Sequence, residues 1–358
     1  MTKRIKEIDN LHITSYEELP APGALKDEFA VSGNVLKTVK YGHRQVKSVL
    51  SRDDSRLIVV VGPCSIHNPE EAIEYAKLLK PLADELADDL LILMRVYFEK
   101  PRTSVGWDGL IYDPHLDGSH RIAHGIRIGR KLMLDIAEIG LPIAIEALDL
   151  ISPQYLQDLV SWTAVGARTT ESPTHRKLAS GISSAIGFKN NVDGELMVAI
   201  NAIRSASANN SFISVTEEGK VAAFRTEGNP HCHIILRGGK SPNYDSESVK
   251  ACEEELRKAG HEENIMIDCS HGNSQKDPGK QLDVLKEIAS QLKKGNESII
   301  GVMIESNLEE GNQPIPDDLE EIRRGVSVTD ACISWKATEL ILRDFATEIG
   351  PALKNRSA

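Results

Sequence analysis

The sequence predicts an α/β protein built on a (β/α)8 TIM barrel, and three observations support this fold. Eight short runs rich in β-branched residues recur along the 358 residues. Helical patterns long enough to return across a parallel sheet separate most of these runs. Nearly every run ends at a residue able to bind a metal, a phosphate or a proton, as barrel enzymes require at the carboxyl ends of their strands. A minimal barrel needs about 250 residues, so the chain has room for additions.

Each predicted strand contributes one reactive side chain at or near its end. In chain order the strands read LIVVVGPC with Cys64, LLILMRV with Arg95, LPIAIEALD with Glu146, AVGAR with Arg168, AIGFK with Lys189, HIILRGG with Arg237, NIMIDCSH with His271, and SIIGVMIE with Glu305.

Helices are expected between the strands. Asn68 before an acidic turn predicts a helix start, and Gly140 predicts a helix end. The helical patterns cover 35–50, 68–87, 120–140, 152–162, 193–207, 246–260 and 279–295. The segment 211–226 reads as a β-hairpin inserted between the fifth and sixth barrel strands. We therefore expect an N-terminal extension at 1–50, with an interface or regulatory role, and a catalytic barrel at 51–358.

Composition narrows the function. A hydrophobic content of 41% with 27% charged residues is typical of a soluble globular protein. The net charge of −11 argues against nucleic acid as a partner. The sequence shows no apolar run of 18 residues and no signal segment, which predicts a cytoplasmic protein without a membrane association. Five cysteines without CxxC spacing do not indicate a disulfide framework.

Four side chains form a candidate metal site: Cys64, His271, Glu305 and Asp330. The first three follow strands one, seven and eight, which become neighbours when the barrel closes. A thiolate, an imidazole and two carboxylates suit a divalent transition ion. A structural reading exists for three of them: Cys64 as a small buried side chain, His271 as a backbone cap, and Asp330 as the N-cap of the last helix.

A second group is cationic. Arg95, Arg168, Lys189 and Arg237 end four strands, and the loop after strand two adds Lys100 and Arg102. Arginine and lysine bind phosphates and carboxylates, so two cationic clusters predict two phosphorylated substrates. A salt bridge between Arg95 and Glu146 is the structural alternative for one pair.

The motifs GPCSIH, MRVYFEKPRTSVGW, GARTTES, GFKN, ILRGGK, DCSHGNS and SVTDACISW resemble the type I 3-deoxy-D-arabino-heptulosonate-7-phosphate (DAHP) synthases over nearly the whole chain. The resemblance implies condensation of phosphoenolpyruvate with D-erythrose 4-phosphate and water, with release of phosphate, as the first step of the shikimate pathway. It implies one divalent metal ion, with Mn, Fe, Co and Zn all open.

The resemblance also assigns residues. It places the metal on Cys64, His271, Glu305 and Asp330. It places phosphoenolpyruvate on the cations of strands two, four, five and six with two backbone positions beside them, namely Arg95, Gly166, Ala167, Arg168, Lys189 and Arg237. It places erythrose 4-phosphate on Lys100, Pro101, Arg102 and Thr103.

Proton transfer is assigned from the chemistry of this reaction. Lys100 is the candidate donor to the nascent alkoxide, and Glu146 or His271 with a bound water is the candidate acceptor. The chain departs from the family pattern at Asn191 and Val192, where we expect GFKNGTDG and find GFKNNVDG. Because Lys189 and Asp193 remain, we expect activity to survive.

The family resemblance further implies feedback inhibition by an aromatic amino acid at a subunit interface, in a homodimer or homotetramer. The corresponding positions are Asn10 from a neighbouring subunit together with Pro153, Gln154, Leu178, Ile182, Ser183, Phe212, Ser214 and Phe224. DNLHIT, EALD and DCSHGNS resemble the tyrosine-regulated enzymes, whereas Ser214 resembles the phenylalanine-regulated ones. The balance favours tyrosine.

Two other functions are open. An octulosonate-phosphate synthase would keep a similar site but fits KPRTS and the regulatory additions less well. A non-catalytic barrel that binds a metal or an effector would be expected to have lost site residues, and none is missing from the sequence.

Overall fold

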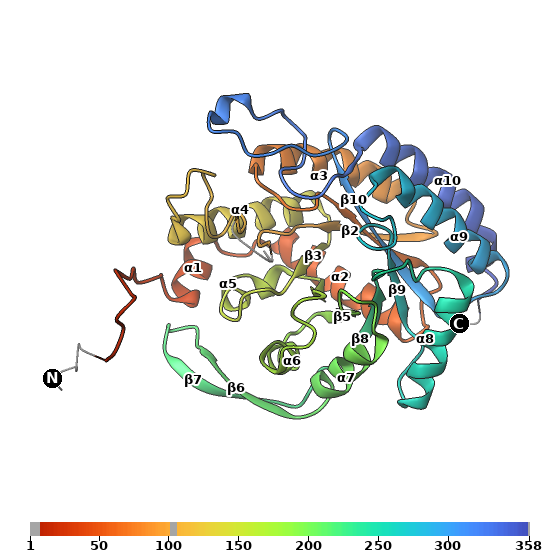
Figure 1. Cartoon of the computed structure of the whole chain (residues 1–358), viewed down its shortest axis with the longest axis horizontal. Coiled ribbons are helices and arrows are strands. Elements are labelled where there is room, and N and C mark those ends of the chain that lie inside the picture. The colour runs from red at the N-terminus through yellow and green to blue at the C-terminus, as the bar shows by residue number, and fades with distance from the viewer. Residues whose placement is uncertain (1–7, 101–105, 357–358) are drawn as a thin grey trace.

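The computed structural model describes residues 8–100 and 106–356, and their strands form a closed parallel barrel surrounded by helices (Figure 1). Neighbouring strands follow the order β1-β2-β3-β4-β5-β8-β9-β10, and β1 pairs with β10 to close the barrel. The barrel strands are β1 (Leu57–Gly62), β2 (Leu90–Arg95), β3 (Ile143–Glu146), β4 (Trp162–Val165), β5 (Ala185–Lys189), β8 (Cys232–Leu236), β9 (Ile265–Asp268) and β10 (Ile299–Asn307). The predicted fold class is confirmed.

Ten α-helices lie in the described part of the chain. They are α1 (Pro22–Glu28), α2 (Gly33–Leu50), α3 (Pro69–Glu85), α4 (Ile122–Ile139), α5 (Pro153–Leu156), α6 (Pro173–Ala179), α7 (Leu196–Ala206), α8 (Ser246–Lys258), α9 (Gln281–Lys293) and α10 (Trp335–Leu353). The side chain of Asn68 caps α3 and Gly140 ends α4 in the left-handed region, as predicted. No helix in residues 8–100 or 106–356 is long and apolar enough to cross a bilayer.

The prediction of one helix over 152–162 is wrong. The α-helix there is the single turn α5, followed by a 3-10 turn over Gln157–Leu159. Strand β4 begins at Trp162 and ends at Val165, and Ser161 already donates its N–H to the carbonyl oxygen of Ile143 on β3. The sheet therefore takes the last residues of the predicted helix, and residues 153–159 form only short helical turns.

Helix α2 closes the floor of the barrel. Its residues Val46, Val49 and Leu50 belong to the same buried cluster as the inward side chains of the strands, among them Trp162. A Cβ at Gly42 would lie 2.1 Å from the Ser161 hydroxyl oxygen, so only glycine permits this close approach. The part of the predicted N-terminal extension that forms α2, Gly33–Leu50, is thus integral to the barrel.

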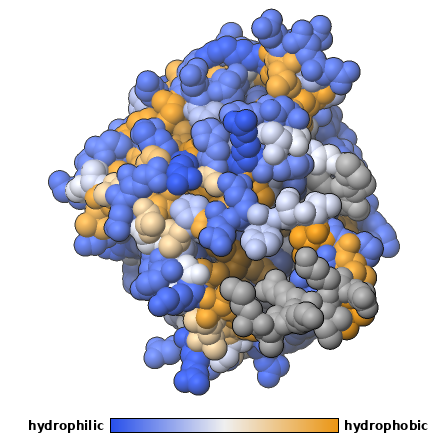
Figure 2. Space-filling view, turned by 90° about the vertical axis from the view of Figure 1, so that its left-hand side faces the viewer, coloured by the Kyte–Doolittle hydropathy of each residue, from blue (hydrophilic) through white to orange (hydrophobic). Residues whose placement is uncertain are grey.

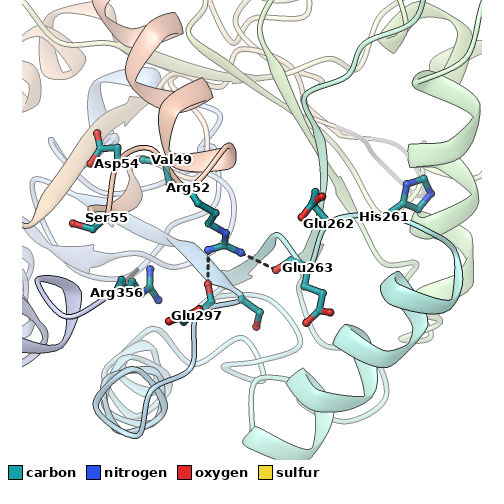
Figure 3. A pocket seen from close by; sticks show the side chains of 10 residues that line it. Val49, Arg52, Asp54, Ser55, His261, Glu262, Glu263, Glu297 and Arg356 are labelled. Carbon is teal, nitrogen blue, oxygen red and sulfur yellow. Dashed lines mark hydrogen bonds between the residues drawn. The ribbon is translucent and has the colours of Figure 1, made fainter. Parts of the chain in front are cut away.

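The loops at the amino ends of the strands are held by arginine side chains. Arg52 donates to the backbone carbonyl oxygens of Glu263 (3.1 Å) and Glu297 (Figure 3). Arg356 donates to the carbonyl oxygens of Asn296 and Ile299, at 3.1 and 2.8 Å. These bonds satisfy main-chain acceptors just before β9 and β10 and at the start of β10, which is a structural role.

The predicted hairpin is present and stands out from the barrel. Strands β6 (Asn210–Val215) and β7 (Val221–Thr226) pair only with each other, and the exposed segment 8–20 projects nearby (Figure 1). Figure 2 shows the molecule from this side, with hydrophobic surface between hydrophilic regions. Large apolar side chains are exposed on both parts, namely Ile8, Leu11, Ile13 and Tyr16 on the segment and Ile213 and Val221 on the hairpin.

Candidate active site

A cavity of about 310 Å³ lies at the carboxyl ends of the barrel strands. Its lining includes the described residues predicted to bind substrate together with Glu146 and three of the metal candidates. These lining residues are Arg95, Lys100, Glu146, Gly166, Ala167, Arg168, Lys189, Arg237, His271, Glu305 and Asp330. Pro101, Arg102 and Thr103, predicted for the aldose phosphate, lie outside the described residues.

Three metal candidates come together. The register of β1 with β10 pairs Gly62 with Glu305, which brings Cys64, two residues further on, beside that carboxylate. The Cys64 sulfur and one carboxylate oxygen each from Glu305 and Asp330 all lie within 4.8 Å of one another. Asp330 does not cap the last helix, because the Ser334 hydroxyl does so. The structural alternative for Asp330 is therefore wrong.

His271 lies beside this cluster rather than within it. Its left-handed backbone (φ 55°) turns the chain three residues after β9. Its Nδ1 lies 2.9 Å from an Asp268 oxygen and 2.7 Å from the Ser270 hydroxyl. Its Nε2 lies 3.7 Å from Glu305 Oε1, so the ring edge that faces the cluster is the one that could bind a metal.

The cluster attracts positive charge. The Lys100 ammonium lies 2.8 Å from the Cys64 sulfur and 3.2 Å from Asp330 Oδ2. Burial and the nearby Glu305 raise the pKa of the Cys64 thiol to about 11. Burial opposes ionisation of Asp330, yet Lys100 and His271 hold the pKa of its carboxyl well below its usual range. A soft thiol, two carboxylates and an adjacent imidazole, already facing a cation, fit a divalent transition ion.

Arg95 anchors the wall of the cavity. Its guanidinium donates to the carbonyl oxygens of Pro63 (3.0 Å) and Cys64 (3.1 Å) and lies 3.6 Å from the centroid of the Tyr97 ring. Its ion pair is with Glu305, at 3.0 Å. The alternative of a salt bridge from Arg95 to Glu146 is therefore wrong. The Glu146 carboxylate instead packs over the backbone of Gly166, where an added Cβ would lie 2.2 Å from Oε1.

Asp268 is a site residue that the sequence prediction missed. Its Oδ2 accepts from the Lys189 ammonium at 2.7 Å and faces His271. Burial opposes its ionisation, but His271 and Lys189 hold the pKa of this carboxyl well below its usual range. Its place at the end of β9, directly before the Cys-Ser-His run, was the available signal. Asp268 thus connects a predicted phosphate ligand with a predicted metal ligand.

Two of the three arginines that line the cavity, Arg168 and Arg237, lie close enough to repel each other. Burial lowers the pKa of Arg237, and the charge of Arg168 acts in the same direction. Repulsion between two guanidinium groups at the wall of one cavity is relieved by an anion, which supports a phosphate or carboxylate as the occupant.

The departure at Asn191 has a structural explanation. The Asn191 side chain is 6% exposed and accepts from the N–H groups of Asp193 and Glu195, at 3.1 and 2.9 Å. It therefore closes the turn after Lys189, and Val192 lies at the cavity wall. The turn is ordered by a side chain here, which is consistent with the expected retention of activity.

Most of the predicted effector residues gather where the hairpin meets the barrel. Phe212 and Phe224 stack with ring centroids 5.8 Å apart, and the Gln154 amide lies 3.4 Å from the buried Ser214 hydroxyl. Leu178 and Ile182 are buried nearby on the same side, while Ser183 is exposed. Pro153 begins α5. Asn10 lies in the exposed segment 8–20.

The fold and the site define a class: a (β/α)8 protein with a cluster of candidate metal ligands beside a cavity lined by cations. The model of the DAHP synthetase I family matches residues 36–343. The Tyr-sensitive phospho-2-dehydro-3-deoxyheptonate aldolase of Escherichia coli K12 is 50% identical over 351 residues, covering 98% of this chain and 99% of that protein. The Phe-sensitive one from the same strain is 52% identical over 341 residues, covering 95% and 97%.

A solved structure agrees with these relatives. Phospho-2-dehydro-3-deoxyheptonate aldolase from Francisella tularensis SCHU S4 superposes with a TM-score of 0.92 at 45% identity, covering 94% of this chain and 98% of that one. The chain belongs to the DAHP synthetase I family. The enzyme class expected from the sequence, a 3-deoxy-7-phosphoheptulonate synthase, is confirmed.

Proposed function

We propose that this cavity is where phosphoenolpyruvate condenses with D-erythrose 4-phosphate, and that its two halves bind the two substrates. Arg95, Arg168, Lys189 and Arg237, with the backbone of Gly166 and Ala167, would bind phosphoenolpyruvate. Lys100 with Pro101, Arg102 and Thr103 would bind the aldose phosphate. The observation that supports this most is that the two carboxylates of the thiol-carboxylate cluster line the same cavity as these four cations.

Cys64, His271, Glu305 and Asp330 would hold one divalent metal ion. When bound, such an ion supplies Lewis acidity that polarises the aldehyde carbonyl. Which of Mn, Fe, Co or Zn serves in the cell depends on availability as well as on these ligands.

Proton transfer falls to residues of the cavity. Burial lowers the pKa of the Lys100 ammonium, but the adjacent Cys64 sulfur and the Asp330 and Glu305 carboxylates outweigh burial and raise this pKa. Lys100 therefore keeps its proton at neutral pH and can donate it to the alkoxide that forms when C3 of phosphoenolpyruvate attacks the aldehyde. Glu146, or His271 with a water, would accept the proton from the water that adds to C2. Arg168, Lys189 and Arg237 would stabilise the charge of the departing phosphate.

Metal removal tests this proposal. Treatment with a chelator should abolish the erythrose 4-phosphate-dependent loss of phosphoenolpyruvate, and addition of a divalent ion should restore it. Turnover should release one phosphate per phosphoenolpyruvate. The aldose phosphate used by octulosonate-phosphate synthases is the comparison substrate. Faster turnover with that aldose, or full activity in the chelator, would contradict the proposal.

We further propose tyrosine as the effector, in a cytoplasmic homodimer or homotetramer whose hairpin and N-terminal segment meet a neighbouring subunit. The relatives leave the effector open, because the Phe-sensitive enzyme is slightly more identical and the Tyr-sensitive one is matched over more of the chain. Exposed apolar side chains on both elements support an interface there.

The Ser214→Gly variant tests the effector site. Ser214 is 1% exposed, so removal of its hydroxymethyl group should make room for a phenolic hydroxyl and strengthen inhibition by tyrosine relative to phenylalanine. The matched control is Ser211→Gly, on the exposed face of the same strand. The measurement is the inhibitor concentration for half activity with each amino acid. Equal inhibition of the wild type by both amino acids would remove the basis for the assignment.

A further inference from the structure

Four asparagines, Asn190, Asn191, Asn243 and Asn273, connect the loops that carry the proposed phosphoenolpyruvate ligands. We propose that this set, the asparagine clamp, fixes the spacing of Arg168, Lys189 and Arg237 and so sets the affinity for phosphoenolpyruvate. They are positioning residues, since they act through those cations. The inference rests on the proposed function of the cavity.

Asn190 links Lys189 to Arg237. Asn190 is fully buried and directly follows Lys189 in the chain. Its Oδ1 accepts from the N–H of Arg237 at 2.9 Å and from the Asn243 amide at 3.2 Å. Its Nδ2 donates to the carbonyl oxygens of Gly238 and Asn191, both at 2.8 Å. Both donors and both acceptor sites of the amide are therefore in use.

Asn243 and Asn273 extend the clamp to the loop after β9. Asn243 Oδ1 accepts from the N–H of Gly238 at 2.7 Å, and the Asn243 N–H donates to Asn273 Oδ1 at 2.8 Å. Asn273, 2% exposed, donates to the carbonyl oxygens of Leu236 (3.1 Å) and Asp268 (2.9 Å). The main chain beside Arg237 is thereby tied to Asp268, the partner of Lys189.

Asn191 extends the clamp in the other direction, to the loop after β4. Its Nδ2 donates to Glu171 Oε1 at 3.0 Å, and Glu171 lies three residues after Arg168. With this bond, the loops after β4, β5, β8 and β9 form one hydrogen-bonded unit.

The loops in this unit touch through their main chains. A Cβ at Gly238 would lie 2.5 Å from the carbonyl carbon of Gly272, and one at Gly239 would lie 2.5 Å from that of Asp193. Because the main chains of these loops are in close contact, one loop has little space to move independently of the others. Loss of a clamp bond should therefore displace the cations that the loops carry. Side-chain amides also suit this connecting role, because they donate and accept hydrogen bonds without carrying a charge. The positive potential of the cavity is therefore preserved.

The test compares phosphoenolpyruvate binding by wild type, Asn190→Ala and Asn243→Ala, each measured calorimetrically on the Mn²⁺-loaded protein without aldose. Asn243 is only half-buried, so its variant should fold even if Asn190→Ala does not. The matched control is Asn229→Ala, at the amino ends of the same two strands. Asn229 is 5% exposed and donates to the carbonyl oxygens of Ile182 (3.0 Å) and Ser184 (2.9 Å).

We expect the clamp variants to bind phosphoenolpyruvate about tenfold more weakly, because small misplacements of binding groups are costly. The KM for erythrose 4-phosphate should stay unchanged. Asn229→Ala should lower the unfolding temperature and leave phosphoenolpyruvate affinity intact. The proposed clamp would be overturned if Asn243→Ala bound phosphoenolpyruvate as tightly as the wild type, or if Asn229→Ala lost as much affinity as the clamp variants. A wild-type protein that does not bind phosphoenolpyruvate would overturn the proposed function as well.

Discussion

Replacement of Cys64 by serine should lower kcat by roughly 10²–10³-fold, since a bound metal ion contributes several kcal/mol to stabilisation of charge in the transition state. The Cys64 sulfur is the soft ligand of the proposed set, and it lies 3.5 Å from Asp330 Oδ2 and within 4.8 Å of a Glu305 oxygen. A hydroxyl at this position ionises far less readily than a thiol and binds transition ions poorly.

The experiment strips the Cys64→Ser protein with a chelator, restores Mn²⁺ and measures kcat together with bound metal per chain. Cys252→Ser is the control, because Cys252 is also fully buried but lies on α8, remote from the cavity lining. The control should keep its metal and its activity. A Cys64→Ser protein with full activity after this treatment would show that the thiol is not a metal ligand.

Replacement of Lys189 by methionine should impair both binding and folding. The Lys189 ammonium lies 2.7 Å from Asp268, and both residues are at least 95% buried. Loss of the ammonium leaves a buried carboxylate with one partner fewer, which should lower the free energy of unfolding by about 3–5 kcal/mol. Loss of a cation facing the substrate phosphate or carboxylate should lower kcat/KM for phosphoenolpyruvate by about 10²-fold or more.

A double variant separates the two effects. Lys189→Met with Asp268→Asn removes the unpaired charge, so it should recover much of the stability and none of the activity. Lys240→Met is the matched control, since Lys240 is 83% exposed on the same face and its ion pair with Asp193 is long, at 3.4 Å. Its unfolding free energy should change by less than about 1 kcal/mol. Unchanged phosphoenolpyruvate kinetics in Lys189→Met would remove Lys189 from the binding site.

The sequence predicted the strands and their terminal residues well because strand ends in a parallel barrel share one face. Gly62 pairs with Glu305, and Met303 with Asp268, so Cys64, Glu305 and the β9 loop had to meet once the strands closed in order. That argument needs only strand order and side-chain type. It therefore predicts which side chains lie at the carboxyl end of the barrel, but not which of them form hydrogen bonds or ion pairs with one another.

The hydrogen-bond and ion-pair partners of these side chains depend on local geometry that a periodic sequence pattern does not predict. Arg95 pairs with Glu305 rather than Glu146 because its guanidinium is held by two carbonyl oxygens over the Tyr97 ring. Lys100 contacts the Cys64 sulfur of the candidate metal site, although the sequence grouped Lys100 with the aldose phosphate. The asparagine clamp was missed because bonds from side-chain amides to the main chain of distant loops follow no spacing in the sequence.

An anomalous difference map of crystals of the Mn²⁺-loaded protein tests the central claim most directly. We predict one peak per chain, bonded to the side chains of Cys64, Glu305 and Asp330 and to His271 through Nε2. His271 is the most discriminating of the proposed ligands, because its Nε2 lies 3.7 Å from Glu305 while its other nitrogen contacts Ser270 and Asp268. A peak with any other set of protein ligands, or no peak at this end of the barrel, would contradict the metal site on which the proposed function rests.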